Sequence, residues 1–209
     1  MSPTLLLKNA LVIATMDDEQ REIANGSVFI RGNRVEAVGP ASELPDTADK
    51  VIDMTGHVLI PGLINTHHHM FQSLTRALPA AQDAELFDWL TALFPVWQNI
   101  TPAMQRAATR TAMAELMLSG CTTAADHAYL YVNGTRLDDS VQAAQEMGMR
   151  FHAVRGAMSL GQSKGGLPPD ALVEQDEDAI LKEMQRVVEE LHDATPDAMI
   201  KVALGPCSP

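Results

Sequence analysis

The feature that most constrains the fold is an alternation of strand-like and helix-like segments that begins after Pro61-Gly62. Four segments are predicted to be strands: LINTHHH (63–69), CTTAADHA (121–128), RFHAVRGAM (150–158) and IKVALGPCSP (200–209). Such alternation predicts an α/β fold with a parallel sheet and crossover helices. It fits the first half of an eight-stranded (β/α) barrel or a small doubly wound sheet. No Gly-rich dinucleotide fingerprint follows the first strand, which favours the barrel.

Helices are predicted between these strands from apolar spacing and from end signals. A helix over 84–98 contains Pro95, and the next has Thr101 as its N-cap, Pro102 at its first position and Gly120 just past its end. Two more are expected, over 137–147 and 176–192.

The region before Pro61 has a different pattern, with short aliphatic runs separated by turn residues. Strands are predicted at 5–9, 10–15, 27–32, 34–39 and 51–53, and Gly32-Asn33 fits the turn of a hairpin. Because no helix separates these strands, we expect an antiparallel sheet or a small β-sandwich. The sequence thus predicts two domains, a β-sandwich segment over 1–60 and the (β/α) part over 61–209.

Composition excludes several classes of protein. The 209 residues carry a net charge of −12, so there is no basic footprint for nucleic acid or anionic lipid. No apolar run reaches the roughly 18 residues of a membrane span, and the N-terminal stretch lacks the features of a signal peptide. Two cysteines are too few for a disulfide scaffold. We therefore expect a cytoplasmic protein without nucleic-acid or membrane partners.

Chemistry is suggested by three consecutive histidines at the end of the first predicted barrel strand. On a strand, His67 and His69 would share one face and His68 the other. Two imidazoles on one face suit Zn, Fe, Ni or Cu, and the carboxyl ends of barrel strands form the active-site mouth. The alternative is a solvated or partly buried histidine cluster.

Four other side chains lie at or soon after predicted strand ends, and each has a structural alternative. Gln72 could bind the edge of a purine through its amide or could cap a loop. His127 could face the pocket or sit in the core. Arg155 could bind a carbonyl or could pair with a neighbouring acid. Cys207 could contact a substrate or act as a small buried apolar residue.

The stretch VIDMTGHVLIPGLINTHHH resembles the amidohydrolase superfamily, through Asp53, Gly56, Pro61-Gly62, His67 and His69. Asn65-Thr66 is similar to the branch that deaminates or dechlorinates purines, pyrimidines and triazines. Three segments are most similar to the members that deaminate 8-oxoguanine: HHHMFQSLTRALP (67–79), GCTTAADHAYLY (120–131) and RGAMSLGQSKGGLPPD (155–170).

The resemblance implies that this chain is the N-terminal part of a longer enzyme. It would comprise strands 1–4 of a (β/α)8 TIM-type barrel, after a β-sandwich segment completed by C-terminal strands outside this chain. His67 and His69 would be two of the ligands of one divalent metal, expected to be zinc. A third metal-binding His, a Glu three residues after it, another His and a metal-binding Asp belong to later strands, so no catalytic acid or base is expected among these 209 residues.

The activity implied is hydrolytic deamination of a purine-like ring by metal-bound hydroxide, converting 8-oxoguanine to urate and ammonia. A carboxylated Lys that bridges two metals belongs at the end of the fourth strand in binuclear members, whereas Lys201 lies at its start. This favours a single metal. The expected partner is a small purine-like substrate, and we expect a homo-oligomer. Isoguanine, guanine, cytosine or triazine hydrolysis, or a non-catalytic truncated fragment, are the alternatives.

Overall fold

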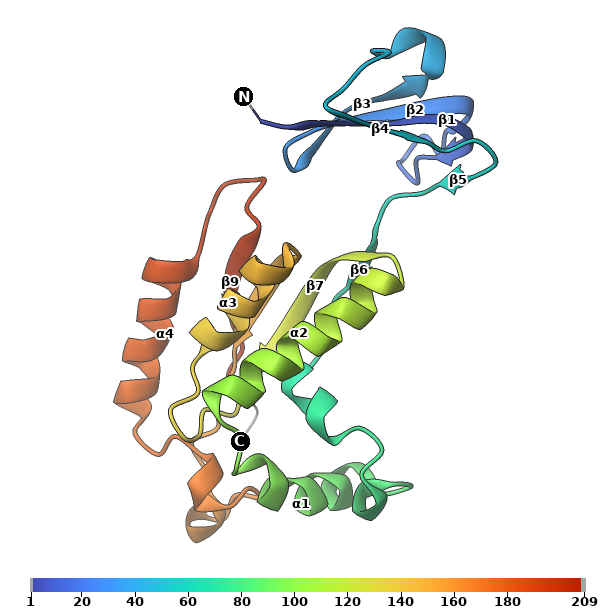
Figure 1. The fold of residues 1–209 in the computed structure, drawn as a ribbon. Helices are drawn as coiled ribbons and strands as arrows, with labels where there is room; N and C mark the ends of the chain where they lie inside the picture. Colours follow the sequence, from blue (N-terminus) through green and yellow to red (C-terminus); the bar gives the residue numbers. More distant parts are fainter. Residues whose placement is uncertain (1, 208–209) are drawn as a thin grey trace. The chain divides into compact units, whose positions relative to one another are not determined.

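The computed structural model describes residues 2–207, and the chain divides into two compact units at the boundary between Gly62 and Leu63 (Figure 1). The N-terminal unit is one five-stranded sheet in the order β3-β2-β1-β4, with β5 also paired to β1. Its strands are β1 (Thr4–Ala14), β2 (Glu22–Arg31), β3 (Arg34–Pro40), β4 (Lys50–Asp53) and β5 (Val58–Leu59). A short 3-10 helix, η1 (Ala41–Glu43), follows β3.

The pairing within this sheet confirms one prediction and corrects two. The hairpin of β2 and β3 turns at Gly32, whose φ of 60° suits a residue without a Cβ. The runs predicted as two strands at 5–9 and 10–15 form the single strand β1, which continues through Asn9 at φ 65° with a shift of register there. The sheet is mixed rather than antiparallel, because β4 and β5 both run parallel to β1. The β-sandwich stays a prediction.

The second unit contains a four-stranded, wholly parallel sheet in the order β6-β7-β8-β9. Its strands are β6 (Leu63–Asn65), β7 (Cys121–Ala128), β8 (Arg150–Arg155) and β9 (Ile200–Leu204). Its helices are α1 (Leu86–Trp97), α2 (Pro102–Leu118), α3 (Leu137–Met147) and α4 (Glu177–Leu191). Four 3-10 helices lie in its loops: η2 (Met70–Thr75), η3 (Pro79–Ala81), η4 (Gln162–Lys164) and η5 (Asp170–Leu172). The predicted alternation of strands and helices is confirmed; closure into a barrel stays a prediction.

Local end signals explain why the helices begin and end where they do. The Thr101 hydroxyl accepts a hydrogen bond from the Met104 amide at 3.3 Å, and Pro102 opens α2. The chain leaves α3 through Gly148, which has a left-handed conformation. The Asp176 carboxylate caps α4 by accepting from the Ala179 amide at 3.1 Å.

Helices α2, α3 and α4 cover one face of the parallel sheet, and the main core lies between them and the strands (Figure 1). Alternate residues of β7, β8 and β9 are buried under these helices, as in Ala124, Asp126 and Ala128 of β7. This core is dominated by small and aliphatic side chains with one central ring: Ala112, Met113, Ala124, Val141, Ala144, Met149, Phe151, Ala153, Val187 and Val202. Helix α1 packs separately, against loops that follow the strands.

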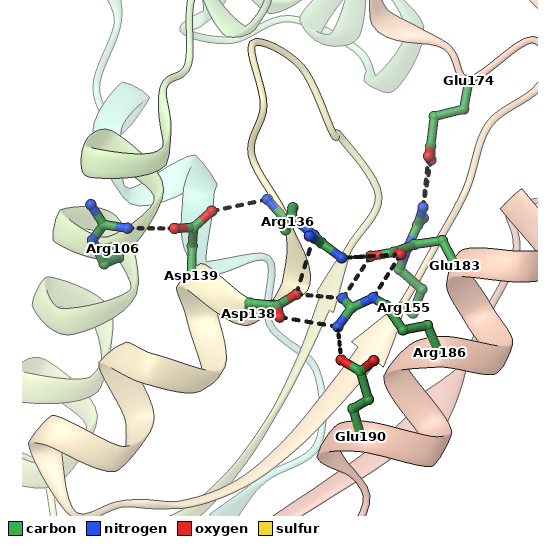
Figure 2. Close-up of polar contacts among 9 residues, drawn as sticks. All are labelled: Arg106, Arg136, Asp138, Asp139, Arg155, Glu174, Glu183, Arg186 and Glu190. Atoms are coloured by element: carbon green, nitrogen blue, oxygen red, sulfur yellow. Dashed lines mark hydrogen bonds and ion pairs between the residues drawn. The ribbon is translucent and has the colours of Figure 1, made fainter. Parts of the chain in front are cut away.

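Charged side chains connect α3 to α4 on the outside of this layer (Figure 2). We call Arg136, Asp138, Glu183, Arg186 and Glu190 the helix-face ion network. The guanidinium of Arg186 lies 2.6 Å from Asp138, 2.7 Å from Glu183 and 2.7 Å from Glu190. Arg136 adds a contact of 3.3 Å to Glu183. Among the helices of residues 2–207, none is long and apolar enough to cross a membrane.

Candidate active site

The carboxyl ends of the four parallel strands lie at one edge of the sheet, and the predicted site residues lie at or soon after these ends. Strand β6 ends at Asn65, so the prediction that the strand extends to residue 69 is wrong. The Asn65 side chain accepts a hydrogen bond from the His67 amide at 3.1 Å, which turns the backbone out of the strand. The chain nevertheless continues beside β7, because the His127 amide donates to the His68 carbonyl at 2.9 Å.

Although they leave the strand, His67 and His69 are close together. Their ring centroids are 5.3 Å apart. Two imidazoles that bind one tetrahedral zinc at about 2.0–2.1 Å have ring centroids about 5 Å apart. The pair therefore fits a shared divalent ion. No group of three or more His, Cys, Asp or Glu side chains within residues 2–207 is placed to hold a metal, so these two would be part of a larger ligand set.

The hydrogen bond of His69 fixes which of its nitrogens is free. Nδ1 lies 2.7 Å from the backbone oxygen of His127, and a carbonyl oxygen only accepts, so Nδ1 carries the proton. The lone pair of Nε2 is then available in the neutral ring. Burial lowers the pKa of His69, which favours this neutral form. A ring nitrogen held by a backbone carbonyl is the usual support for a metal-binding histidine.

His127 and Tyr129 complete the polar group at this edge. The His127 Nε2 donates to the Gly205 carbonyl at 2.6 Å, which connects the end of β7 to the chain after β9. The ring centroids of His69 and His127 are 5.5 Å apart, and that of Tyr129 lies 5.3 Å from His69 and 5.4 Å from His127. We call His67, His69, Asp126, His127 and Tyr129 the strand-end cluster.

Asp126 is the buried member of this cluster. Its side chain is fully enclosed under the helix layer, and Oδ1 accepts from the Met70 amide at 2.7 Å. The other oxygen, Oδ2, has no hydrogen-bond partner among residues 2–207. Burial raises the pKa of Asp126 to about 7. Asp126 points to the opposite side of β7 from His127. Its carboxyl therefore binds the backbone of the residue that directly follows His69.

A cavity of about 490 Å³ opens beside the three histidines. Gln72 lines it, and the Gln72 Nε2 donates to the Tyr129 hydroxyl at 3.1 Å. Burial raises the pKa of Tyr129 to about 12, so its hydroxyl keeps its proton at neutral pH. The pair thus offers an amide oxygen that accepts and a hydroxyl that donates. Trp89 of α1 lies at the same cavity.

Cys207 and Tyr129 line a second cavity, of about 650 Å³. Its other walls are mostly apolar and come from α1, the loop after β8 and α4. Burial raises the pKa of the Cys207 thiol, so the protonated thiol is the favoured form. Cys207 thus lies within reach of this space, next to the strand-end cluster but without a metal-binding partner of its own in the described part of the chain.

Arg155 forms an ion pair with a neighbouring acid, which from the sequence was the alternative to binding a substrate carbonyl. Its side chain is 1% exposed and points to the helix side of β8, where it pairs with Glu174 at 2.7 Å (Figure 2). It also donates to the Gly156 carbonyl and stacks on Tyr131, with Cζ 3.7 Å from the ring centroid. Arg155 lines neither cavity. The ion pair instead holds the loop after β8 to the strand.

Sequence reasoning did not select Asp126 or Tyr129. Strand alternation contained a signal for the first: if His127 faces the pocket, Asp126 must face the helices, where a carboxylate is unusual. Tyr129 follows the predicted strand directly, but nothing local indicates its contact with Gln72. The backbone carbonyls of His127 and Gly205 carry no sequence signal at all.

Residues 58–209 match the amidohydrolase family, and the chain belongs to that family. It is 42% identical over 205 residues to the 8-oxoguanine deaminase of Pseudomonas aeruginosa. That match covers 97% of this chain and 45% of the relative. The hydroxydechloroatrazine ethylaminohydrolase of Pseudomonas sp. strain ADP is 36% identical, over 90% of this chain and 42% of the relative.

Solved structures agree with this assignment. The atrazine chlorohydrolase of Arthrobacter aurescens TC1, in complex with zinc, superposes with a TM-score of 0.88 at 30% identity. The match covers 97% of this chain and 46% of that one. The chain thus spans less than half the length of the relatives it matches.

Proposed function

We propose that this chain contributes the first two metal ligands and part of the substrate pocket of a metal-dependent aminohydrolase. The observation that carries the proposal is the arrangement of His67 and His69, with ring centroids 5.3 Å apart and His69 Nδ1 held by a carbonyl. The zinc named in the chlorohydrolase structure supports zinc as the metal. The 42% identity to an 8-oxoguanine deaminase supports 8-oxoguanine as the first substrate to test.

The two histidines and the residues around them have different proposed roles in metal binding. When bound, a divalent metal would supply acidified water for attack on the amine-bearing carbon of the ring. His67 and His69 would hold this metal through neutral imidazoles. The His127 carbonyl keeps the proton on His69 Nδ1, and the bond from His127 Nε2 to Gly205 keeps that carbonyl in place.

Gln72 and Tyr129 are proposed to recognise the substrate. The edge of an oxidised purine presents adjacent N–H and C=O groups. The Gln72 amide oxygen can accept from the first, and the Tyr129 hydroxyl, which keeps its proton, can donate to the second. Cys207 borders the adjoining cavity and remains a proposed substrate contact. His127 lies beside this pair but lines neither cavity, and its contact with the substrate stays a prediction. Arg155 is better assigned to holding the loop that follows β8.

The test is a screen of the complete natural protein, with zinc supplied, for ammonia release from 8-oxoguanine, isoguanine, guanine, cytosine, isoxanthopterin and aminotriazines. We expect the highest kcat/KM with 8-oxoguanine. A preference for the triazines would favour the second candidate, which the 36% identity to a triazine ethylaminohydrolase supports. No turnover of any ring, with zinc bound, would contradict the proposed activity and leave the non-catalytic alternative.

A further inference from the structure

Strand β7 holds the segment His68–Met70 at three points. The His127 amide donates to the His68 carbonyl at 2.9 Å, and His69 Nδ1 donates to the His127 carbonyl at 2.7 Å. The third contact is the Met70 amide, which donates to Asp126 Oδ1 at 2.7 Å. On the β7 side, the first two contacts use only backbone atoms. Asp126 is therefore the single β7 side chain through which a substitution can loosen this hold.

Burial of the Asp126 carboxyl is unfavourable for the stability of the folded state. Its side chain is 0% exposed, Oδ2 has no hydrogen-bond partner among residues 2–207, and no ion pair is formed with it there. Burying a polar group without full pairing costs stability, and an apolar residue would avoid that cost. The Met70 amide is the one hydrogen-bond donor it binds in the described residues. An acid differs from an apolar residue at this position because it can accept the hydrogen bond of the Met70 amide.

Met70 determines how the chain leaves His69. It is the first residue of η2, which carries Gln72 into the cavity, and its side chain is fully buried. His69, directly before it, has φ −130° and ψ 84°. The Met70 amide therefore anchors the backbone directly after the His69 Cα, and a shift of that Cα would move the His69 ring relative to the His127 carbonyl. The direction of Nε2 would then no longer be fixed.

We propose that Asp126 is a positioning residue that fixes the His69 imidazole for metal binding by accepting the hydrogen bond of the Met70 amide. This inference rests on the proposed role of His69 as a metal ligand. Asp126 does not itself touch the metal or substrate. Its effect on the metal should resemble that of other groups that orient ligands, whose removal typically weakens metal affinity about 10- to 100-fold.

The experiment compares four variants of the complete protein with the wild type. D126A and D126L both remove the acceptor, and D126L does so while filling the space. D126N keeps an amide oxygen as the acceptor. The matched control, E174Q, changes the buried ion pair of Arg155 at the next strand, away from residues 68–70. The measurements are the zinc dissociation constant from chelator competition, hydrogen–deuterium exchange of the peptide containing Met70 in the metal-free protein, and the thermal midpoint.

We expect D126A and D126L to bind zinc about 10- to 100-fold more weakly and to exchange the Met70 amide faster. D126N should remain close to the wild type in both measurements. E174Q should lower the thermal midpoint with zinc affinity unchanged. Wild-type zinc affinity in D126A or D126L would overturn the proposal. Loss of folding in both, with D126N folded, would also overturn it, because Asp126 would then be a structural residue.

The same data separate this inference from the proposed function. If the wild type binds no zinc, the metal assignment of His69 fails, while the exchange of the Met70 amide still reports whether Asp126 holds it. If the wild type binds zinc and the variants bind it equally well, only the positioning role fails.

Discussion

The strand-end cluster and the helix-face ion network lie in the same unit, but their polar groups are satisfied in different ways. In the cluster, hydrogen bonds connect side chains to the backbone, as for His69 with His127, His127 with Gly205 and Asp126 with Met70. In the network, side chains of opposite charge bind one another, with Arg186 contacting three carboxylates (Figure 2). In the cluster Asp126 is fully buried and only His67 is exposed, whereas in the network Arg136 and Glu190 are exposed and no member is fully buried.

The pKa shifts differ in the same way. In the cluster, burial is the largest cause and favours neutral forms: the pKa of Asp126 rises to about 7 and that of His69 falls. In the network, hydrogen bonds between ions favour charged forms: the pKa of Glu183 falls because of Arg186, and that of Arg186 rises because of Glu183. A metal binds imidazole in its neutral form. Ion pairs at the helix surface connect helices while changing the free energy of unfolding only slightly. The comparison predicts that changes in the cluster alter binding and changes in the network alter only stability.

The largest expected effect is on metal content. H67A and H69A should each abolish zinc occupancy of the complete protein, because each removes one of the two proposed ligands. H68A is the matched control from the same segment and should retain most of the zinc. Metal content is measured by elemental analysis of the purified variants. Equal loss in all three variants would show that the cluster does not select His67 and His69.

The second effect is a dependence of stability on pH that comes from Asp126. Unfolded, Asp126 loses its proton near pH 4, whereas in the folded protein it keeps the proton until about pH 7. Between these values the folded state binds more protons, so the free energy of unfolding falls as pH rises and levels off above pH 7. In D126N this contribution is absent. The difference in thermal midpoint between the metal-free wild type and D126N should therefore shift with pH in favour of D126N from pH 4 to pH 7.

A flat difference across that range would mean that Asp126 titrates in the ordinary carboxyl range. E174Q provides the comparison, since Glu174 is paired with Arg155 rather than buried without a charged partner.

The third effect concerns substrate recognition. Q72L should lower kcat/KM by about 10-fold, equivalent to roughly 1–2 kcal/mol for one lost hydrogen bond, with zinc content unchanged. Q82L is the control, because Gln82 lines the same cavity without the contact to Tyr129. Steady-state kinetics of both variants make the measurement. Unchanged kcat/KM in Q72L would remove Gln72 from the proposed substrate contacts.

The smallest effect should come from the network. R186Q should lower the free energy of unfolding by about 1 kcal/mol, and by less at high salt, because partly exposed ion pairs are screened. K182Q on the same helix is the control for a change of charge outside the network. Zinc affinity should not change. A loss of zinc in R186Q would contradict the division between the two regions.

Several elements were predictable because their signals lie within a few residues. Thr101, Pro102 and Gly120 mark the ends of α2, and the segment at 121–128 forms a strand with the predicted bounds. The HxH pattern predicted a metal site, and the structure brings the rings of His67 and His69 to a centroid distance of 5.3 Å. The same reasoning failed where a local side chain diverted the backbone, as Asn65 does at the end of β6, and where strands paired across a loop, as β4 and β5 do with β1.

What only the tertiary structure decided is the set of partners around the histidines. The contacts from Asp126 to Met70, from His69 to His127 and from His127 to Gly205 span 56, 58 and 78 residues of sequence. Alternation along a strand tells which residues share a face, but the packing of neighbouring segments determines which polar atoms meet. For that reason the sequence by itself determined the family and the order of strands and helices in the second unit, and it predicted the pair His67 and His69 as metal ligands. Burial and long-range pairing decided that the Asp126 carboxyl accepts from the Met70 amide, next to His69, and that Arg155 faces the helices.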